Sequence, residues 1–302
     1  MYKSTLNASK LYLGLAKQAE VSRKKLHKRH PHVVTFFHNH GVNLEHFRQH
    51  AVRAAATTAM ASAMLFGQPL TQQVLSTPAN QIATMSADQL RTMLTNQLKS
   101  LLPDDVRPLT RPEEDAVSQE LKSIWGIDAH GTLSNEHLNT TYGFIGAEQH
   151  LPRFPGDSVS EHDAYQNSGI TPGRGAWGYF APSRDQLTQD LIQKEKWYVA
   201  VQTLYLPDWN TRTRELSQWY KYRKVLVVNP VNGKTVVADV ADAGPANWTG
   251  KHFGGSPEVM GYLGLNVHMQ KGAVLLFFVN DPNAEIPLGP VEYNVRYGKP
   301  IL

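Results

Sequence analysis

The feature that most constrains the fold is a C-terminal succession of strand and turn signals. Residues 225–228 (VLVV) are apolar and mostly β-branched, a composition typical of a buried strand. The Asn-Gly pair at 232–233 predicts a tight turn, because both residue types tolerate positive φ. Residues 235–240 then predict a second strand, and residues 256–265 predict one short helix that ends at a glycine.

A carboxylate ends the second of these strands. Asp242 begins the sequence Asp-Ala-Gly-Pro, where the strand meets a loop at the rim of the expected sheet. Functional side chains commonly lie at such positions, so Asp242 is the first candidate for a catalytic residue. The alternative is a structural carboxylate that accepts hydrogen bonds from the backbone N–H groups of its own loop.

This order of elements resembles the double-psi β-barrel of the rare lipoprotein A and expansin-like families. The resemblance covers residues 197–281 and implies a six-stranded barrel in an α+β chain. The family motifs are a turn of the form Asn-x-x-Asn-Gly-Lys, the Asp-x-Gly-Pro strand end, and a short helix that ends in Leu-Gly before a final strand. The matching residues here are Asn229, 232–234, 242–245, Gly250, Ser256, 263–265 and 273–279.

Two departures from the family pattern bear on activity. The family has Asp-Leu-Ser where this chain has Gly-Gly-Ser at 254–256. The lytic members also carry a histidine in a segment that corresponds to residues 198–209, which contain none here. Both departures favour binding over catalysis.

The resemblance implies a protein that binds peptidoglycan or a related cell-wall polysaccharide and cleaves it as a lytic transglycosylase does. Such cleavage needs one carboxyl group, here Asp242, which protonates the leaving oxygen and later accepts a proton from the C6 hydroxyl of the sugar. Glycoside hydrolysis would need two carboxyl groups ~5–9 Å apart. Asp239 points to the opposite face of the strand, so His252 and Glu258 are the better candidate partners.

Aromatic residues are expected to stack on the sugar rings. The candidates are Tyr205, Trp209, Trp219, Tyr220, Trp248 and Trp177. Two other functions stay open. One is a non-catalytic, expansin-like glycan-binding module, and the other is a membrane-tethered structural or assembly protein. Neither a cofactor nor a metal ion is expected.

The N-terminal part has the layout of an export signal with a long basic leader. Residues 1–53 hold ten Lys and Arg residues against two Glu residues, whereas the rest of the chain is near neutral, so no nucleic-acid partner is expected. Residues 54–66 carry no charge and have the length of a signal-peptide core, which predicts an extracytoplasmic protein, membrane-anchored or secreted. The alternative is an Ala-rich helix of a soluble domain. The chain has no cysteine, which does not decide the compartment.

Seven histidines lie in the basic leader: His27, His30, His32, His38, His40, His46 and His50. They indicate either metal binding or, as we favour, a leader that is simply rich in histidine. We expect three regions. Residues 1–85 form the leader, anchor segment and linker, residues 86–135 form two helices, and residues 136–302 form a barrel domain decorated with long aromatic loops.

Overall fold

The computed structural model describes residues 85–266 and 271–297. The chain divides into two compact units, Met1–Gln73 and Val74–Leu302, and the described residues belong to the second. The basic leader, its histidines and the apolar segment 54–66 lie outside the described residues. Within the described ranges, no helix is both long and apolar enough to cross a bilayer.

Two helices open the described part of the chain, as expected. Helix α5 (Ala87–Leu101) begins after Ser86, whose Oγ accepts a hydrogen bond from the N–H of Gln89 while the Gln89 side chain accepts one from the N–H of Ser86. Helix α6 (Arg111–Trp125) ends at Gly126, which has a φ of 73°. The left-handed conformation of this residue is one that glycine adopts without strain.

Six strands form a closed barrel of mixed direction. They are β4 (Tyr142–Ala147), β5 (Tyr198–Val201), β6 (Lys224–Val228), β7 (Thr235–Ala243), β8 (Phe253–Gly255) and β9 (Lys271–Val279). Pairing runs β9-β4-β8-β5-β7-β6 and returns to β9. The β4–β8 and β5–β7 pairs are parallel and the other four are antiparallel. The expected α+β chain with a six-stranded C-terminal barrel is thus confirmed.

Four short strands lie outside the ring. Strand β1 (Ala129–His130) pairs with β9, and β10 (Gly289–Pro290) pairs with β7. Strands β2 (Thr132–Leu133) and β3 (Glu136–His137) form a separate two-stranded sheet. Strands β1, β2 and β3 lie in the segment that connects α6 to β4, whereas β10 follows β9.

The two faces of strands β6 and β9 belong to two hydrophobic cores. Alternate residues such as Val225, Val227 and Phe278 fill the barrel interior. Their neighbours, such as Leu226 and Phe277, face outward and pack with α5 and α6. Because both faces are buried, these strands are almost continuously apolar. The two helices therefore share a core with the barrel.

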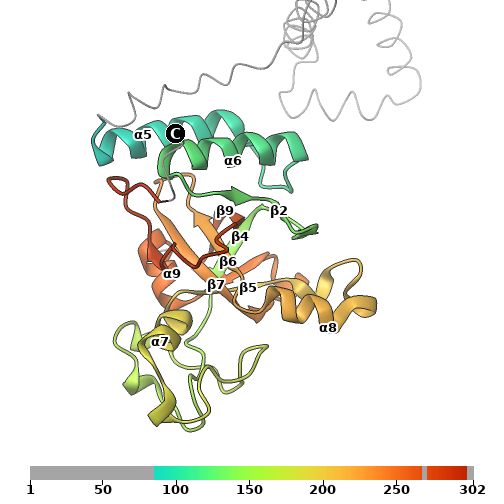
Figure 1. Ribbon diagram of the computed structural model, residues 1–302, viewed down its shortest axis with the longest axis vertical. Coiled ribbons are helices and arrows are strands. Elements are labelled where there is room, and N and C mark those ends of the chain that lie inside the picture. The colour runs from blue at the N-terminus through green and yellow to red at the C-terminus, as the bar shows by residue number, and fades with distance from the viewer. Residues whose placement is uncertain (1–84, 267–270, 298–302) are drawn as a thin grey trace, which may run out of the picture. The chain divides into compact units, whose positions relative to one another are not determined.

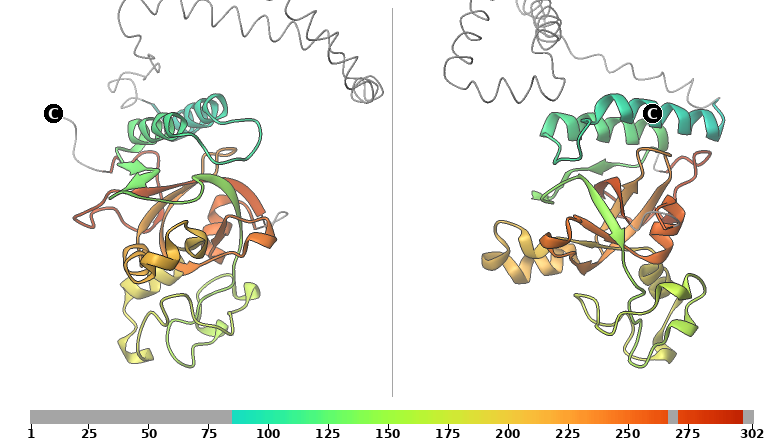
Figure 2. Two further views of the ribbon diagram at one scale, coloured as in Figure 1. Left: turned by 90° about the vertical axis from the view of Figure 1, so that its right-hand side faces the viewer. Right: turned by 180° about the vertical axis from the view of Figure 1, so that it is seen from behind.

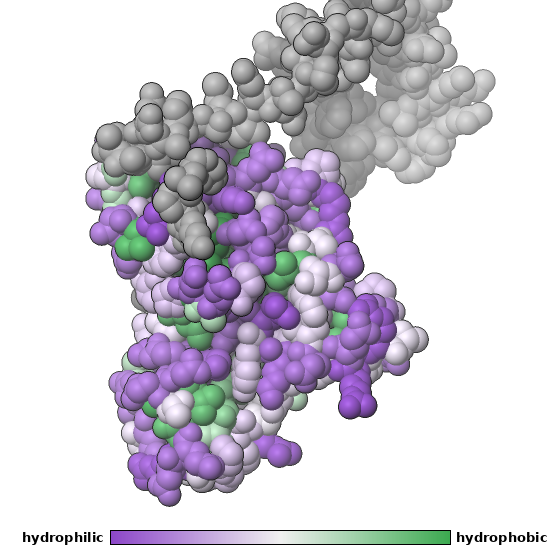
Figure 3. All heavy atoms as spheres, in the orientation of Figure 1, coloured by the Kyte–Doolittle hydropathy of each residue, from purple (hydrophilic) through white to green (hydrophobic). Residues whose placement is uncertain are grey.

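Three further helices surround the barrel. They are α7 (Gln189–Lys196), α8 (Trp209–Tyr220) and α9 (Pro257–Leu263). Helices α5 and α6 cover one side of the barrel, while α7 and the loops after β4 lie on the opposite side, and the views of Figure 1 and Figure 2 agree on this. Hydrophilic residues cover most of the face shown in Figure 3, and hydrophobic residues form small separate groups on it.

The structure corrects three expectations about the barrel elements. Its first strand is β4, inside the segment that we expected to be loop-like. The glycines at 143 and 146 reduce the apolar character of this strand and so conceal it. Residues 197–206 alternate in the sequence as one strand would, but strand β5 ends at Val201 and is followed by a single helical turn, Thr203–Tyr205. Helix α8 was not expected at all.

Candidate functional site

The candidate site lies on the outer face of the barrel, on a row of small residues. Asp242, Ala200, Gly254 and Gly146 are in register across β7, β5, β8 and β4. Both chain neighbours of Ala200 belong to the barrel core, so Ala200 itself faces outward. The row, which we call the strip, is therefore a band of small buried residues beneath covering side chains, with Asp242 at one end.

One oxygen of the Asp242 carboxylate is held by the backbone. Its Oδ1 accepts hydrogen bonds from the N–H groups of Ala243 and Ala176, both at 2.8 Å. Among the described residues, no hydrogen-bond donor reaches Oδ2. Burial raises the pKa of Asp242, and the two N–H groups lower it by a smaller amount, so that the pKa lies above its ordinary value. Asp242 is thus both a loop cap and a carboxylate with one free oxygen.

A second carboxylate, which the sequence analysis did not assign, lies over the same row, two strands away from Asp242. Glu148 follows β4, and its N–H donates to the carbonyl of Gly255 at 2.9 Å. Its side chain lies over Gly254, where a Cβ would overlap the carboxylate oxygen. Burial raises the pKa of Glu148, the charge of Lys251 lowers it, and the charge of Asp242 raises it. The only sequence signal for this arrangement is the glycine that leaves room for the carboxylate.

Two further side chains lie at this row: Lys251 covers one of its glycines, and Gln202 bonds to the loop that follows Asp242. The side chain of Lys251 lies over Gly146 in the same way as Glu148 lies over Gly254. Gln202 is buried, and its Nε2 donates to the carbonyl of Pro245 at 2.9 Å, to Oδ1 of Asn247 at 2.8 Å and to the carbonyl of Lys251 at 3.1 Å. This side chain fixes the loop that follows Asp242.

Two of the six expected aromatic residues are exposed at this rim. Trp248 is 88% exposed and Tyr205 is 41% exposed. Their loops are joined by a hydrogen bond from the N–H of Asn247 to the hydroxyl of Tyr205, at 3.3 Å. These two side chains are available to a ligand.

The other four aromatic residues have structural contacts. Trp177 donates from Nε1 to the carbonyl of Ser217 in α8 at 2.9 Å, which ties its loop to that helix. Trp209 and Trp219 are partly buried against the barrel core. Tyr220 is fully buried in that core, so it offers no surface for a sugar ring.

The three candidate partners of Asp242 lie elsewhere. Asp239 is 2% exposed and, contrary to the expectation, lies on the same outer face of β7 as Asp242. The register shift in the β5–β7 pairing between Val199 and Ala200 changes the simple alternation along β7. The Nδ1 of His252 accepts a hydrogen bond from the N–H of Phe144 at 3.0 Å. Glu258 lies in the first turn of α9 and faces a buried histidine. Within the described ranges, no hydrogen bond or ion pair connects these three residues to Asp242.

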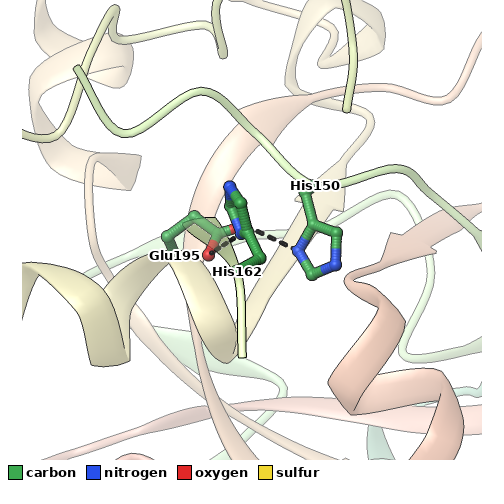
Figure 4. A group of neighbouring side chains, drawn as sticks. All are labelled: His150, His162 and Glu195. Atoms are coloured by element: carbon green, nitrogen blue, oxygen red, sulfur yellow. Dashed lines mark hydrogen bonds and ion pairs between the residues drawn. The ribbon is translucent and has the colours of Figure 1, made fainter. Parts of the chain in front are cut away.

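A separate group of buried ionisable residues lies between the loops and α7. The carboxylate of Glu195 faces Nδ1 of His150 at 3.2 Å and Nδ1 of His162 at 3.3 Å (Figure 4). One ligand atom from each of these three residues lies within 4.8 Å of the other two. Burial raises the pKa of the nearby Glu258 to about 7. The donor set is one that can hold a metal ion.

No protein-family model matches this chain, and a search of curated proteins finds no match to it. The function therefore has to be inferred from the barrel and from the side chains on it.

Proposed function

We propose that this protein binds and cleaves a β-1,4-linked cell-wall glycan of the peptidoglycan type at the Asp242 end of its barrel. The observation that carries the proposal is the pair of carboxylates, Asp242 and Glu148, which lie on one row of small residues and whose charges interact. Two carboxylates whose charges interact supply acid–base chemistry, and the exposed rings of Trp248 and Tyr205 offer a sugar chain a surface to stack on.

The barrel is, in this proposal, of the double-psi type. The closed ring of six strands with two parallel pairs supports that type, together with the order of the turn, the Asp-x-Gly-Pro strand end and the short helix. The rare lipoprotein A and expansin-like families that this order resembles have an acidic residue at the position of Gly254. Here Glu148 places its carboxylate over Gly254 from a neighbouring strand, and so it replaces the missing acid in space.

The reaction that this arrangement supports needs no water molecule. Asp242 donates a proton to the glycosidic oxygen as the bond from that oxygen to C1 breaks. The C6 hydroxyl oxygen of the same sugar then bonds to C1 and gives its proton back to Asp242. Positive charge develops on the ring between these events, and the carboxylate of Glu148 stabilises it electrostatically. The products are a shortened glycan and a chain that ends in a 1,6-anhydro sugar.

The test is the release of anhydro sugars from soluble peptidoglycan strands by the full chain. Asp242→Asn keeps the shape of the side chain and removes the proton, so we expect cleavage to fall at least ~100-fold while glycan binding and Tm stay nearly unchanged. Glu148→Gln is expected to lower cleavage as well. Asp185→Asn, an exposed residue outside the strip, is the matched control and should cleave at the wild-type rate.

A non-catalytic glycan-binding module is the second candidate. The exposure of Trp248 and Tyr205 on adjoining loops favours it, because such rings bind sugars without any acid. Binding of peptidoglycan without product release would establish this module. If the wild-type chain neither binds nor cleaves the glycan, both functions are contradicted.

A further inference from the structure

The buried group around Glu195 is built from four segments that are distant in sequence. His150 follows β4, His162 ends the helical turn Val159–Glu161, Glu195 lies in the last turn of α7, and Glu258 lies in the first turn of α9. All four side chains are at most 6% exposed. The Oγ of Ser256 donates to the carbonyl of Lys196 at 2.7 Å, which brings the two helix ends together.

Each histidine has an acceptor for its outer nitrogen. The Nε2 of His150 lies 3.1 Å from the carbonyl of Ala164, and the Nε2 of His162 lies 3.2 Å from the carboxylate of Asp157. Histidines that bind a metal ion usually donate their second N–H to a carbonyl or a carboxylate in this way. With a proton on each Nε2, both Nδ1 lone pairs point at the Glu195 carboxylate, and a cation between them would remove the repulsion.

An unpartnered oxygen in the same place also indicates a missing cation. The Oε2 of Glu258 is buried and has no hydrogen-bond partner among the described residues, and it lies 4.0 Å from Nδ1 of His150. A tetrahedral ion with bonds of ~2.0–2.1 Å separates its ligand atoms by ~3.3 Å. Each histidine lies near this distance from one oxygen of Glu195, His150 from Oε1 at 3.2 Å and His162 from Oε2 at 3.3 Å. The carboxylate therefore faces both histidines, and Oε2 of Glu258 is the candidate fourth donor.

We propose that His150, His162, Glu195 and Glu258 bind one Zn²⁺ ion. Nitrogen and oxygen donors in a closed, four-coordinate arrangement suit zinc in a structural site, where no position is open to a substrate. This inference differs from the expectation that the chain has no metal site, and it does not rest on the proposed function.

The ion would order the loops that form one wall of the strip. Glu148 lies two residues before His150, and the bridge between His150 and Ile170 leads to the loop whose Ala176 N–H donates to Asp242. Zinc binding would thus fix these loops to α7 and α9, and through those helices to the barrel. The chain has no cysteine, so no disulfide can do the same.

The test measures Zn²⁺ and Co²⁺ binding by the full chain after removal of free metal. The seven leader histidines are replaced by glutamine in every variant, because they would bind metal themselves. We expect one Zn²⁺ per chain, a rise in Tm of several degrees on Zn²⁺ addition, and the visible absorption of four-coordinate Co²⁺. Glu258→Gln should lower the affinity at least ~10-fold, and His162→Gln should abolish binding.

Glu161→Gln provides the matched control, since the carboxylate of Glu161 pairs with Arg184 at 3.0 Å and is not one of the proposed ligands. It should bind Zn²⁺ as the unsubstituted background does. The proposal is overturned if the folded background chain retains no Zn²⁺, or if Glu258→Gln and Glu161→Gln bind it equally well. If His162→Gln does not fold, the Glu258→Gln comparison and the Co²⁺ spectrum still decide the matter.

Discussion

At the scale of single residues, one glycine decides where a charged side chain of the strip lies. Gly254 has no Cβ, and the Glu148 carboxylate occupies the space that a Cβ would need. The backbone at this position is ordinary extended strand, so the requirement comes from close approach and not from strain. Any larger residue would displace the Glu148 carboxylate from its place over Gly254.

We therefore expect Gly254→Ala to separate the pair without unfolding the protein. The carboxylate is the far end of a flexible side chain, so it can move aside and the free energy of unfolding should change by less than ~1 kcal/mol. Glycan cleavage should fall roughly tenfold or more. Gly173→Ala, at an exposed position with free space around it, should change neither quantity. An unchanged cleavage rate in Gly254→Ala would remove Glu148 from the reaction.

Asp239 makes stability depend on pH. Its side chain is 2% exposed, its Oδ1 has no hydrogen-bond partner in the described part of the chain, and burial raises its pKa from 3.8 to about 7. Below pH ~4 the group is neutral in both the folded and the unfolded chain. As the pH rises towards 7 the unfolded chain loses the proton first, so the free energy of unfolding falls.

Asp239→Asn should remove this dependence, because asparagine resembles the protonated acid and does not titrate. We expect the variant and the wild type to be similarly stable at pH 4, and the variant to be more stable above pH 7 by as much as roughly 4 kcal/mol. Chemical denaturation over this pH range gives the difference. Asp185→Asn serves as the exposed control, and a variant that is less stable at pH 8 would contradict the assignment.

At the scale of elements, two serine N-caps differ in the number of helices that they contact. Ser86 is exposed and caps α5 alone. Ser256 is fully buried, and its Oγ accepts from the N–H of Val259 at 3.2 Å and donates to the carbonyl of Lys196. The second serine therefore connects α9 to the end of α7 as well as capping its own helix.

Ser256→Ala should accordingly lower the free energy of unfolding more than Ser86→Ala does. Loss of an exposed cap costs ~1 kcal/mol. Loss of a buried cap that also leaves a carbonyl without its donor should cost ~2–3 kcal/mol. Denaturant unfolding of the two variants measures the difference. Equal costs would mean that the α7–α9 connection contributes nothing to stability.

Local signals made the helix ends predictable. Ser86 and Ser256 are N-caps, and Gly126 and Gly264 adopt the left-handed conformation just after a helix, so each boundary can be read from a few neighbouring residues. The turn at 232–233 and strands β6, β7 and β9 have equally local signals. Strand β4 does not, because its two glycines weaken the apolar pattern.

The site was only half predictable. Asp242 has a motif around it, and the structure places it at the end of β7 on the rim. Glu148 has no motif, and it reaches the row that contains Asp242 only because β4 runs beside β8 in the ring. The burial of Tyr220 likewise depends on how α8 packs against the barrel. Contacts between segments far apart in sequence have no local signal in a single chain.

At the scale of the whole described unit, the shared core predicts that the smallest stable domain includes helices α5 and α6. A domain that begins at residue 136, as the sequence suggested, would lack both helices. Helices α5 and α6 cover the outward apolar faces of β6 and β9. A fragment of residues 74–302 should be monomeric and unfold cooperatively. A fragment of residues 136–302 lacks both helices and should aggregate, because it exposes Leu226, Phe277 and their neighbours. Size-exclusion chromatography and thermal unfolding compare the two, and a monomeric, cooperative shorter fragment would show that the helices are dispensable.

The closure of the ring also dictates when the protein can fold. Strand β9 pairs with both β4 and β6, so that Tyr142 lies opposite Leu275 and Leu226 lies opposite Phe277. During synthesis, the earlier strands leave the ribosome long before β9 is made, and until then the ring stays open with its apolar residues exposed to water. Long-range pairing of this kind slows folding and leaves aggregation-prone intermediates exposed. The ring can therefore close only after β9 has left the ribosome, and until then the nascent chain presents its apolar strands to chaperones.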